Sequence, residues 1–404
     1  MPDQALEIPK IISVDDHVVE PAHLWQTWLP EKYKAAGPRS ERRGIGSMKH
    51  IGGGVYEQTF DENGPQADCW IFEDLVYINK RHVAAVGFDR DDMSMSPITY
   101  DEMRPGCYDP KARLEDMDLN WVEASLCFPT MPRFCGQTFT EATDRDLALL
   151  CVKAYNDYQV EEWCAGTGGR LIPLIIVPLW DPVLAAEEVY RNAARGVHAV
   201  CFSELPNRLG LPSIHDPEGH WDPFFRACDE TNMVINMHIG SSSQMPSTSP
   251  DAPAAVGSSL THINAELSMA DWLMSGLFER FKNLKVAYSE GQIGWIPYLL
   301  HRMDVVWEEN RGWGGVADKV PNPPSSYFPG HVFGCFFDDP AGLALIDQIG
   351  EDNITYESDY PHSDSTWPLT KQIAEQQMAN LTEEQRWKVL RGNAIKLFSL
   401  DLPA

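Results

Sequence analysis

Four short stretches of the 404-residue chain each place a side chain that can bind a metal ion at the end of an apolar run. The runs end at Asp15 and His17, at His238, at Glu290 and at Asp359. Imidazole nitrogens and carboxylate oxygens are common ligands of zinc, manganese and iron. Because the runs lie far apart in the sequence, only a closed barrel of parallel strands would bring their ends together. If it does, the chain is a metalloenzyme.

Asp15 and His17 form the first pair that could share an ion. Side chains two residues apart in a strand point to the same face, so both can reach one metal. Such a pair also occurs by chance, and the alternative is a hydrogen-bonded pair that closes the sheet. His238 and Asp359 at the ends of two further runs make the combination much more specific than any single residue.

The apolar runs alternate with helical patterns. Eight runs have the composition of strands buried on both faces, at 11–17, 122–129, 171–179, 198–204, 233–240, 284–290, 331–338 and 354–360. Helical patterns lie at 140–164, 181–195, 222–230, 258–281, 292–310, 340–349 and 368–380. This alternation predicts an α/β fold, a (β/α)₈ TIM barrel with its catalytic groups at the carboxyl ends of the strands. A doubly wound sheet is the main rival, but it normally carries a Gly-rich phosphate loop after the first strand, and none is present.

The pattern predicts a single domain over residues 1–404. Residues 20–108 do not fit the repeat, and we expect them to form an insertion over the barrel mouth. Residues 241–257 follow His238 directly and are rich in small residues, which indicates either a lid or a surface loop. Residues 382–404 are expected to form a closing helix and tail.

Composition excludes some partners. The formal net charge of −27 repels nucleic acid and anionic membranes, so we expect neither as a partner. Nine cysteines without a CxxC pair indicate buried thiols in a reducing compartment. Residues 1–10 lack the apolar core of a signal peptide, and no apolar run reaches the length of a membrane span. The expected location is therefore the cytoplasm.

Several motifs resemble those of a known family. The Asp15-x-His17 pair, the step that ends at His238, and Ser358-Asp359-Tyr360-Pro361-His362 resemble the amidohydrolase-related (amidohydrolase-2) family. The stretch 289–298, with Arg302-Met303-Asp304, resembles the sixth-strand signature of that family. The resemblance spans the chain outside 20–108. It implies a (β/α)₈ barrel, metal ligation by Asp15, His17, His238 and Asp359, and C–C hydrolysis, amide hydrolysis or non-oxidative decarboxylation.

Glu290 departs from the family pattern, in which decarboxylases usually have His at the end of the sixth strand. As a fifth ligand it gives two imidazoles and three carboxylates, a set that suits two bridged ions better than one. This variant resembles a branch of the family, the non-haem di-iron monooxygenases of platensimycin and platencin biosynthesis. That likeness implies two Fe ions, hydroxylation of a bulky terpenoid acid or its coenzyme A thioester, and a ferredoxin electron donor. The alternative is a mononuclear Zn or Mn hydrolase or non-oxidative decarboxylase.

The remaining site residues carry open alternatives. Glu290 is a ligand, a catalytic base or a carboxylate that orients His238, and His362 is a ligand, a proton shuttle or a loop partner. Phe134 and Arg133 follow the second strand at the end that would line a substrate pocket, and His301 is expected to be structural or to line the pocket. Lys80, Arg81 and Arg208 join Arg133 as candidates for a basic patch that binds an anionic small-molecule substrate. Aromatic residues in 20–108 indicate either a large apolar substrate or the interface of a homo-oligomer.

Overall fold

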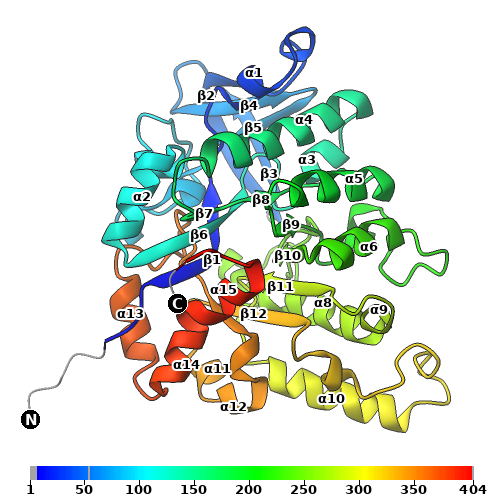
Figure 1. Cartoon of the computed structure of the whole chain (residues 1–404). Coiled ribbons are helices and arrows are strands. Elements are labelled where there is room, and N and C mark those ends of the chain that lie inside the picture. Colours follow the sequence, from blue (N-terminus) through cyan, green and yellow to red (C-terminus); the bar gives the residue numbers. More distant parts are fainter. Residues whose placement is uncertain (1–6, 53–54, 403–404) are drawn as a thin grey trace, which may run out of the picture.

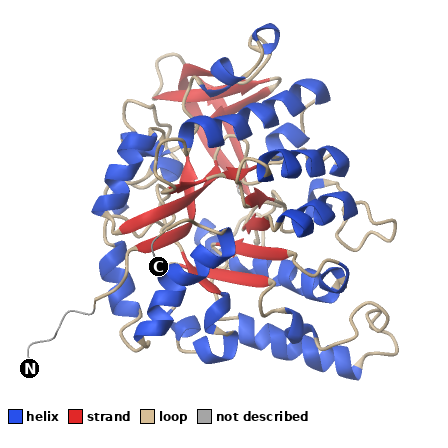
Figure 2. Cartoon of the chain, in the orientation of Figure 1, coloured by secondary structure: helices blue, strands red, loops and turns tan. Residues whose placement is uncertain are grey.

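The computed structural model describes residues 7–52 and 55–402, and its centre is a barrel of parallel strands surrounded by helices (Figures 1 and 2). Strand β1 pairs in parallel with both β6 and β13, and the parallel pairing continues around the sheet. The barrel strands are β1 (Ile11–Val18), β6 (Val122–Pro129), β7 (Leu171–Ile172), β8 (Leu174–Ile175), β9 (Ala199–Cys201), β10 (Val234–His238), β11 (Lys285–Ser289), β12 (Val332–Phe336) and β13 (Ile354–Tyr356). The predicted TIM barrel is confirmed.

One predicted strand is divided in two. The run 171–179 forms β7 and β8 on either side of Pro173, so that β7 pairs with β6 and β8 pairs with β9. Proline has no backbone N–H to donate to a neighbouring strand, which explains the interruption at this residue. Nine strand segments therefore occupy the eight predicted positions of the barrel.

Helices on the outside of the barrel connect successive strands. The longer ones are α2 (Pro110–Leu119), α4 (Arg145–Tyr158), α5 (Pro182–Ala193), α6 (Asp222–Thr231), α8 (His262–Met274), α10 (Ile296–Glu309) and α13 (Thr370–Gln377). Asp109, Asp144 and Asp181 cap the first N–H groups of α2, α4 and α5. The pattern over 258–281 predicts one helix, but α8 ends before Gly276, which has a left-handed φ of 78°, and the short α9 (Leu277–Arg280) follows.

The insertion after β1 forms a second, antiparallel sheet. Its order is β3–β2–β4–β5, from β2 (Arg39–Gly52), β3 (Val55–Phe60), β4 (Gln66–Phe72) and β5 (Leu75–Ile78). The sheet lies with α1 (Leu24–Trp28) at the top of Figure 1. Arg42 on β2 pairs with Asp68 on β4 at 2.9 Å, and Asp68 also accepts the Tyr100 N–H at 2.7 Å. These contacts join the sheet to the rest of the insertion.

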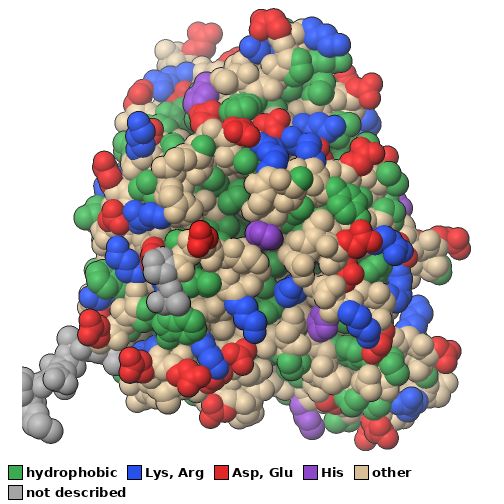
Figure 3. Space-filling view, in the orientation of Figure 1, with side chains coloured by type: hydrophobic (Ala, Val, Ile, Leu, Met, Phe, Trp, Pro, Cys, Tyr) green, Lys and Arg blue, Asp and Glu red, His purple; other side chains and the backbone are tan. Residues whose placement is uncertain are grey.

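The predicted closing helix is interrupted. Helices α14 (Glu383–Trp387) and α15 (Asn393–Phe398) flank a π-helical turn over 388–392. All nine cysteines are free thiols, and eight of them are buried, as predicted. Among the described residues, no helix has both the length and the hydropathy of a membrane span. On the face drawn in Figure 3, acidic side chains are interspersed with basic ones and do not gather in one patch.

Candidate metal centre

Strand β1 directs two side chains that can bind a metal ion, Asp15 and His17, to one side, and the carboxylate of Asp16 to the other. The Asp15 Oδ1 and His17 Nε2 atoms lie 3.6 Å apart, and all eight residues of the strand are buried. The intervening Asp16 accepts hydrogen bonds from the Ser358 hydroxyl at 2.7 Å and from the Tyr360 N–H at 3.0 Å. Asp16 thereby holds β1 against the segment after β13, which carries further donors.

His238 is the last residue of β10. Its Nδ1 lies 2.6 Å from the Ile239 carbonyl, which can only accept, so the proton sits on Nδ1 and Nε2 keeps its lone pair. Nε2 lies 3.5 Å from Asp15 Oδ2 and 3.2 Å from Glu290 Oε1. The Phe134 ring stacks on the imidazole with centroids 3.9 Å apart. His238 is therefore held in the tautomer that a metal ion requires of this nitrogen.

Glu290 directly follows β11, Asp359 lies three residues after the end of β13, and both have unusual backbone conformations. Their φ angles are 55° and 53°, a left-handed region that residues other than glycine rarely adopt and that clusters at functional sites. Glu290 Oε1 lies 3.9 Å and Asp359 Oδ1 lies 3.2 Å from His17 Nε2. The Asp359 N–H donates to the Asp15 carbonyl at 3.0 Å. The strained turns thus direct both carboxylates to the same point.

His362 adds a sixth donor. Its Nδ1 lies 3.1 Å from Asp359 Oδ1 and 3.7 Å from Glu290 Oε1, and its ring stacks on His17 with centroids 3.5 Å apart. Within the described part of the chain, the donors form two overlapping groups whose ligand atoms lie within 4.8 Å of one another. One group is Asp15, His17, His238 and Glu290, and the other is His17, Glu290, Asp359 and His362.

The donor set fits a divalent cation. Both carboxylate oxygens of Asp15 and of Asp359, both ring nitrogens of His17 and Nε2 of His238 are buried without a hydrogen-bond partner among the described residues. Each such group costs about 1–3 kcal/mol if it stays unpaired. Two ligands of one ion at bond lengths of about 2.1 Å lie roughly 3.0–3.4 Å apart, close to the separations found here. A cation would satisfy these atoms together.

The electrostatics of the cluster agree with this fit. Burial, followed by repulsion from neighbouring carboxylates, raises the pKa of Asp15 and of Asp359 well above the usual range. Burial also raises the pKa of Glu290, but His238 and His362 outweigh it, and the pKa of Glu290 falls below its ordinary value. Burial lowers the pKa of His17 and keeps its lone pair available. A bound divalent cation favours the ionised carboxylates.

A cavity of about 500 Å³ opens on the cluster, a volume typical of small-ligand sites. The side chains of Glu290 and His362 are 16 % and 15 % exposed toward it, whereas those of Asp15, His17 and Asp359 are at most 1 % exposed. The walls are mainly apolar or aromatic, and the insertion contributes part of them. The wall residues include Phe134, Ile239 and Met245 from the barrel loops, Tyr77, Val83 and Met95 from the insertion, and the cations Lys80 and Arg133.

The structure brings most of the predicted site residues together. Asp15, His17, His238, Glu290, Asp359 and His362 form the cluster, and Phe134 and Arg133 line the cavity above it. His301, which was expected to be structural or to line the pocket, does not line this cavity. His301 is exposed on α10, whose buried stripe consists of Ile296, Leu300, Met303 and Trp307, and it is absent from the cavity wall. Of the other basic candidates, Arg81 and Arg208 do not line the cavity either.

Three residues near the cluster were missed by sequence reasoning. Glu357 is fully buried next to Glu290, and His82 of the insertion lines the cavity with its Nδ1 buried and without a partner among the described residues. Glu204 follows β9 and accepts the N–H groups of Gly240 and Ser242 in the loop after His238. The position of Glu204 and Glu357 just after a buried strand is the signal that could have identified both.

Fold and site together define a metal-dependent TIM-barrel enzyme. A family profile described as Amidohydrolase matches residues 22–400, so the chain belongs to the amidohydrolase family. The match begins after β1 and thus leaves out Asp15 and His17.

Comparison with individual proteins gives distant relatives. The chain is 24% identical over 319 residues to a 2-amino-3-carboxymuconate-6-semialdehyde decarboxylase of Dictyostelium discoideum, and the alignment covers 74% of this chain and 79% of the relative. The fold of this chain is similar to that of an amidohydrolase of Mycobacterium avium subsp. paratuberculosis (TM-score 0.67, 21% identity, 97% and 100% of the two chains). It is also similar to that of the 5-carboxyvanillate decarboxylase of Novosphingobium aromaticivorans with manganese and 4-hydroxy-3-methoxy-5-nitrobenzoic acid (TM-score 0.59, 18% identity, 80% and 89%).

These names bear on the predicted reaction. Two of the relatives named above are decarboxylases, none is named as a monooxygenase, and the structure of one of them contains manganese. They support the alternative of a non-oxidative decarboxylase better than the di-iron oxygenase that the number of carboxylates favoured.

Proposed function

We propose that the protein is a metal-dependent, non-oxidative decarboxylase of a small aromatic or conjugated organic acid. The observation that carries the proposal is that the metal-binding residues lie in a cavity whose mainly apolar wall includes Phe134, the cations Lys80 and Arg133, and one further carboxylate, Asp364. Such a cavity accepts a flat anion and directs it toward a cation. Named relatives that act on carboxylated substrates support the same chemistry.

The deeply buried donors would hold the ion. Asp15, His17, His238 and Asp359 are the proposed ligands, and Glu290 lies close enough to be a fifth. When bound, a divalent cation of the manganese or zinc type supplies Lewis acidity that anchors and polarises the acid. The aromatic ring of the substrate would lie against Phe134, and Lys80 and Arg133 would offset its charge in a protein of net charge −27.

The reaction requires a proton at the carbon that loses the carboxylate. The C–C bond breaks, CO₂ leaves, and the electron pair stays on the carbon, which then takes up a proton. Among the six metal-binding residues, His362 and Glu290 have side chains partly exposed to the cavity. Their Nδ1 and Oε1 atoms lie 3.7 Å apart. We propose that His362 delivers the proton and that Glu290 helps His362 to regain a proton afterwards. A small side-chain movement would bring these two atoms within hydrogen-bond distance.

A second candidate remains the non-haem di-iron monooxygenase, favoured by one observation. The six donors form two overlapping groups that share His17 and Glu290, an arrangement that two bridged ions could also use. This candidate requires O₂, an electron donor such as a ferredoxin, and a bulky acid or coenzyme A thioester as substrate.

One assay separates the two candidates. The metal-loaded protein is supplied with 5-carboxyvanillate and other hydroxylated aromatic acids in the strict absence of O₂, and CO₂ release is measured. The decarboxylase releases CO₂ at the same rate with and without O₂. Turnover that consumes O₂ and stops without it would overturn the proposal in favour of the oxygenase.

A further inference from the structure

Glu357 occupies a position next to the cluster that neither the ligand groups nor the proposed reaction uses. It directly follows β13, and its side chain is fully buried. Its Oε2 accepts the backbone N–H of Glu290 at 3.1 Å and lies 2.5 Å from the Cys335 thiol. One carboxylate oxygen thus connects the ends of three neighbouring strands, β11, β12 and β13.

The backbone of Glu290 has a conformation that requires stabilising contacts. Its left-handed φ of 55° is a conformation that L residues adopt at a cost, and that persists only where neighbours hold it. In this conformation Oε1 lies 3.2 Å from His238 Nε2, 3.7 Å from His362 Nδ1 and 3.9 Å from His17 Nε2. A return to extended backbone would move the carboxylate away from the three imidazoles.

We infer that Glu357 is a positioning residue that holds Glu290 in its left-handed conformation and so places the Glu290 carboxylate among three imidazoles. Glu357 belongs to neither group of donors whose atoms lie within 4.8 Å of one another. Its contact with Glu290 goes to the backbone N–H and leaves the Glu290 carboxylate to face the cluster.

Cys335 completes the arrangement from the other side. Its Sγ lies 2.5 Å from Glu357 Oε2 and 2.9 Å from the Tyr288 carbonyl, two residues before Glu290. A thiol has one proton, so it donates to one of these acceptors at a time. Cys335 therefore limits the movement of Glu357 relative to β11.

The inference rests on the metal centre of the proposed function but not on decarboxylation, so metal binding tests it separately. Glu357→Gln retains an oxygen that can accept the Glu290 N–H, whereas Glu357→Met has similar length and no acceptor. Mn²⁺ affinity of the metal-stripped, folded proteins is measured from the EPR signal of free Mn²⁺, and Co²⁺ absorption reports the ligand field.

Loss of contacts that orient metal ligands typically weakens binding about 10- to 100-fold. We expect Glu357→Met to lose Mn²⁺ affinity by this factor with an altered Co²⁺ spectrum, and Glu357→Gln to stay within about 3-fold of the native affinity. Glu188→Met is the matched control, because Glu188 is also buried, but its side chain is hydrogen-bonded to Asn156 and Arg191, which do not belong to the cluster. It should lower stability and leave Mn²⁺ affinity unchanged.

Two results would overturn the inference. Native Mn²⁺ affinity in Glu357→Met would show that Glu290 does not need the contact, and a Glu357→Gln variant as weak as Glu357→Met would show that the charge of Glu357 acts directly on the ion. If Glu357→Met does not fold, Cys335→Ala and Cys335→Ser replace it. The serine variant, which keeps a donor to Glu357, should then bind Mn²⁺ more tightly than the alanine variant, and equal affinities would contradict the inference.

Discussion

Glu204, at the edge of the site, should make the free energy of unfolding depend on pH. Its Oε1 accepts the Gly240 N–H at 3.0 Å, the Ser242 hydroxyl at 2.8 Å and the Asn264 amide at 2.9 Å, while its buried Oε2 has no partner among the described residues. Burial raises the pKa of Glu204 from 4.5 to about 7 despite these hydrogen bonds. The folded protein therefore holds the proton more tightly than the unfolded chain does.

The sign of the pH dependence follows from that shift. Because the folded pKa is above the unfolded pKa, the stabilising contribution is fully present below pH 4.5 and is lost as the pH rises through about 7. At 1.36 kcal/mol per pKa unit, the loss amounts to about 3 kcal/mol. Glu204→Gln cannot ionise and keeps an acceptor oxygen, so it should match the native protein at acidic pH and exceed its stability by about 3 kcal/mol above neutrality.

The assay is urea denaturation of both metal-stripped proteins at acidic and mildly alkaline pH. The difference between the two free energies of unfolding should grow with pH, and turnover of the metal-loaded variant should stay within a few-fold of native because the loop after His238 is still held. A difference that is independent of pH, or a variant that is less stable above neutrality, would refute the reasoning.

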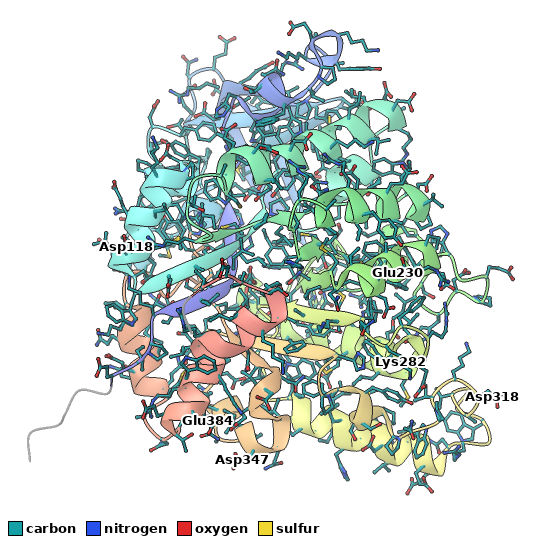
Figure 4. All side chains as sticks on the ribbon, in the orientation of Figure 1. Asp118, Glu230, Lys282, Asp318, Asp347 and Glu384 are labelled. Atoms are coloured by element: carbon teal, nitrogen blue, oxygen red, sulfur yellow. The ribbon has the colours of Figure 1, made fainter. Side chains whose placement is uncertain are left out.

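Three further predictions concern the cluster and its cavity. Glu290→Gln should weaken Mn²⁺ binding at least about 100-fold if Glu290 is a ligand, whereas full metal occupancy with lost turnover would identify it as a base only. Lys80→Met should raise KM about 10- to 100-fold with kcat nearly unchanged, since a charge-assisted contact contributes about 1.5–3 kcal/mol. Lys282→Met is the control for Lys80→Met. Lys282, labelled in Figure 4, is exposed and pairs only with Glu279 among the described residues. Equal effects of the two variants on KM would contradict the role of Lys80. Phe134→Leu removes the ring stacked on His238 and should weaken Mn²⁺ binding by no more than about 10-fold, measured by the same EPR titration.

The sequence was sufficient to predict the barrel and the convergence of its main donors. Asp15, His17 and His238 lie within or at the ends of regular strands, and the strand period and the barrel topology determine where such residues point. For His301 the sequence held a signal that was not used, because the residue lies off the apolar stripe of α10 that begins at Ile296 and Leu300.

The contacts that these and other residues make depended on local geometry, although Glu357 follows a buried strand and Lys80 was already a candidate. Glu357 acts on Glu290 only because Glu290 has a left-handed backbone and β13 ends at Tyr356. Lys80 and His82 reach the cavity because the insertion folds back over the barrel mouth. The expected two irons came from counting carboxylates, and a count of ligands does not determine how many ions they share.

The central claim is that the buried donors of Asp15, His17, His238 and Asp359 hold a cation. Equilibrium titration of the metal-stripped protein with Mn²⁺, with the bound metal counted per chain by mass spectrometry, tests it most directly. We predict one tightly bound ion per native chain and none in an Asp15→Ala variant that remains folded. Native protein that takes up no more Mn²⁺ than this variant would contradict the account.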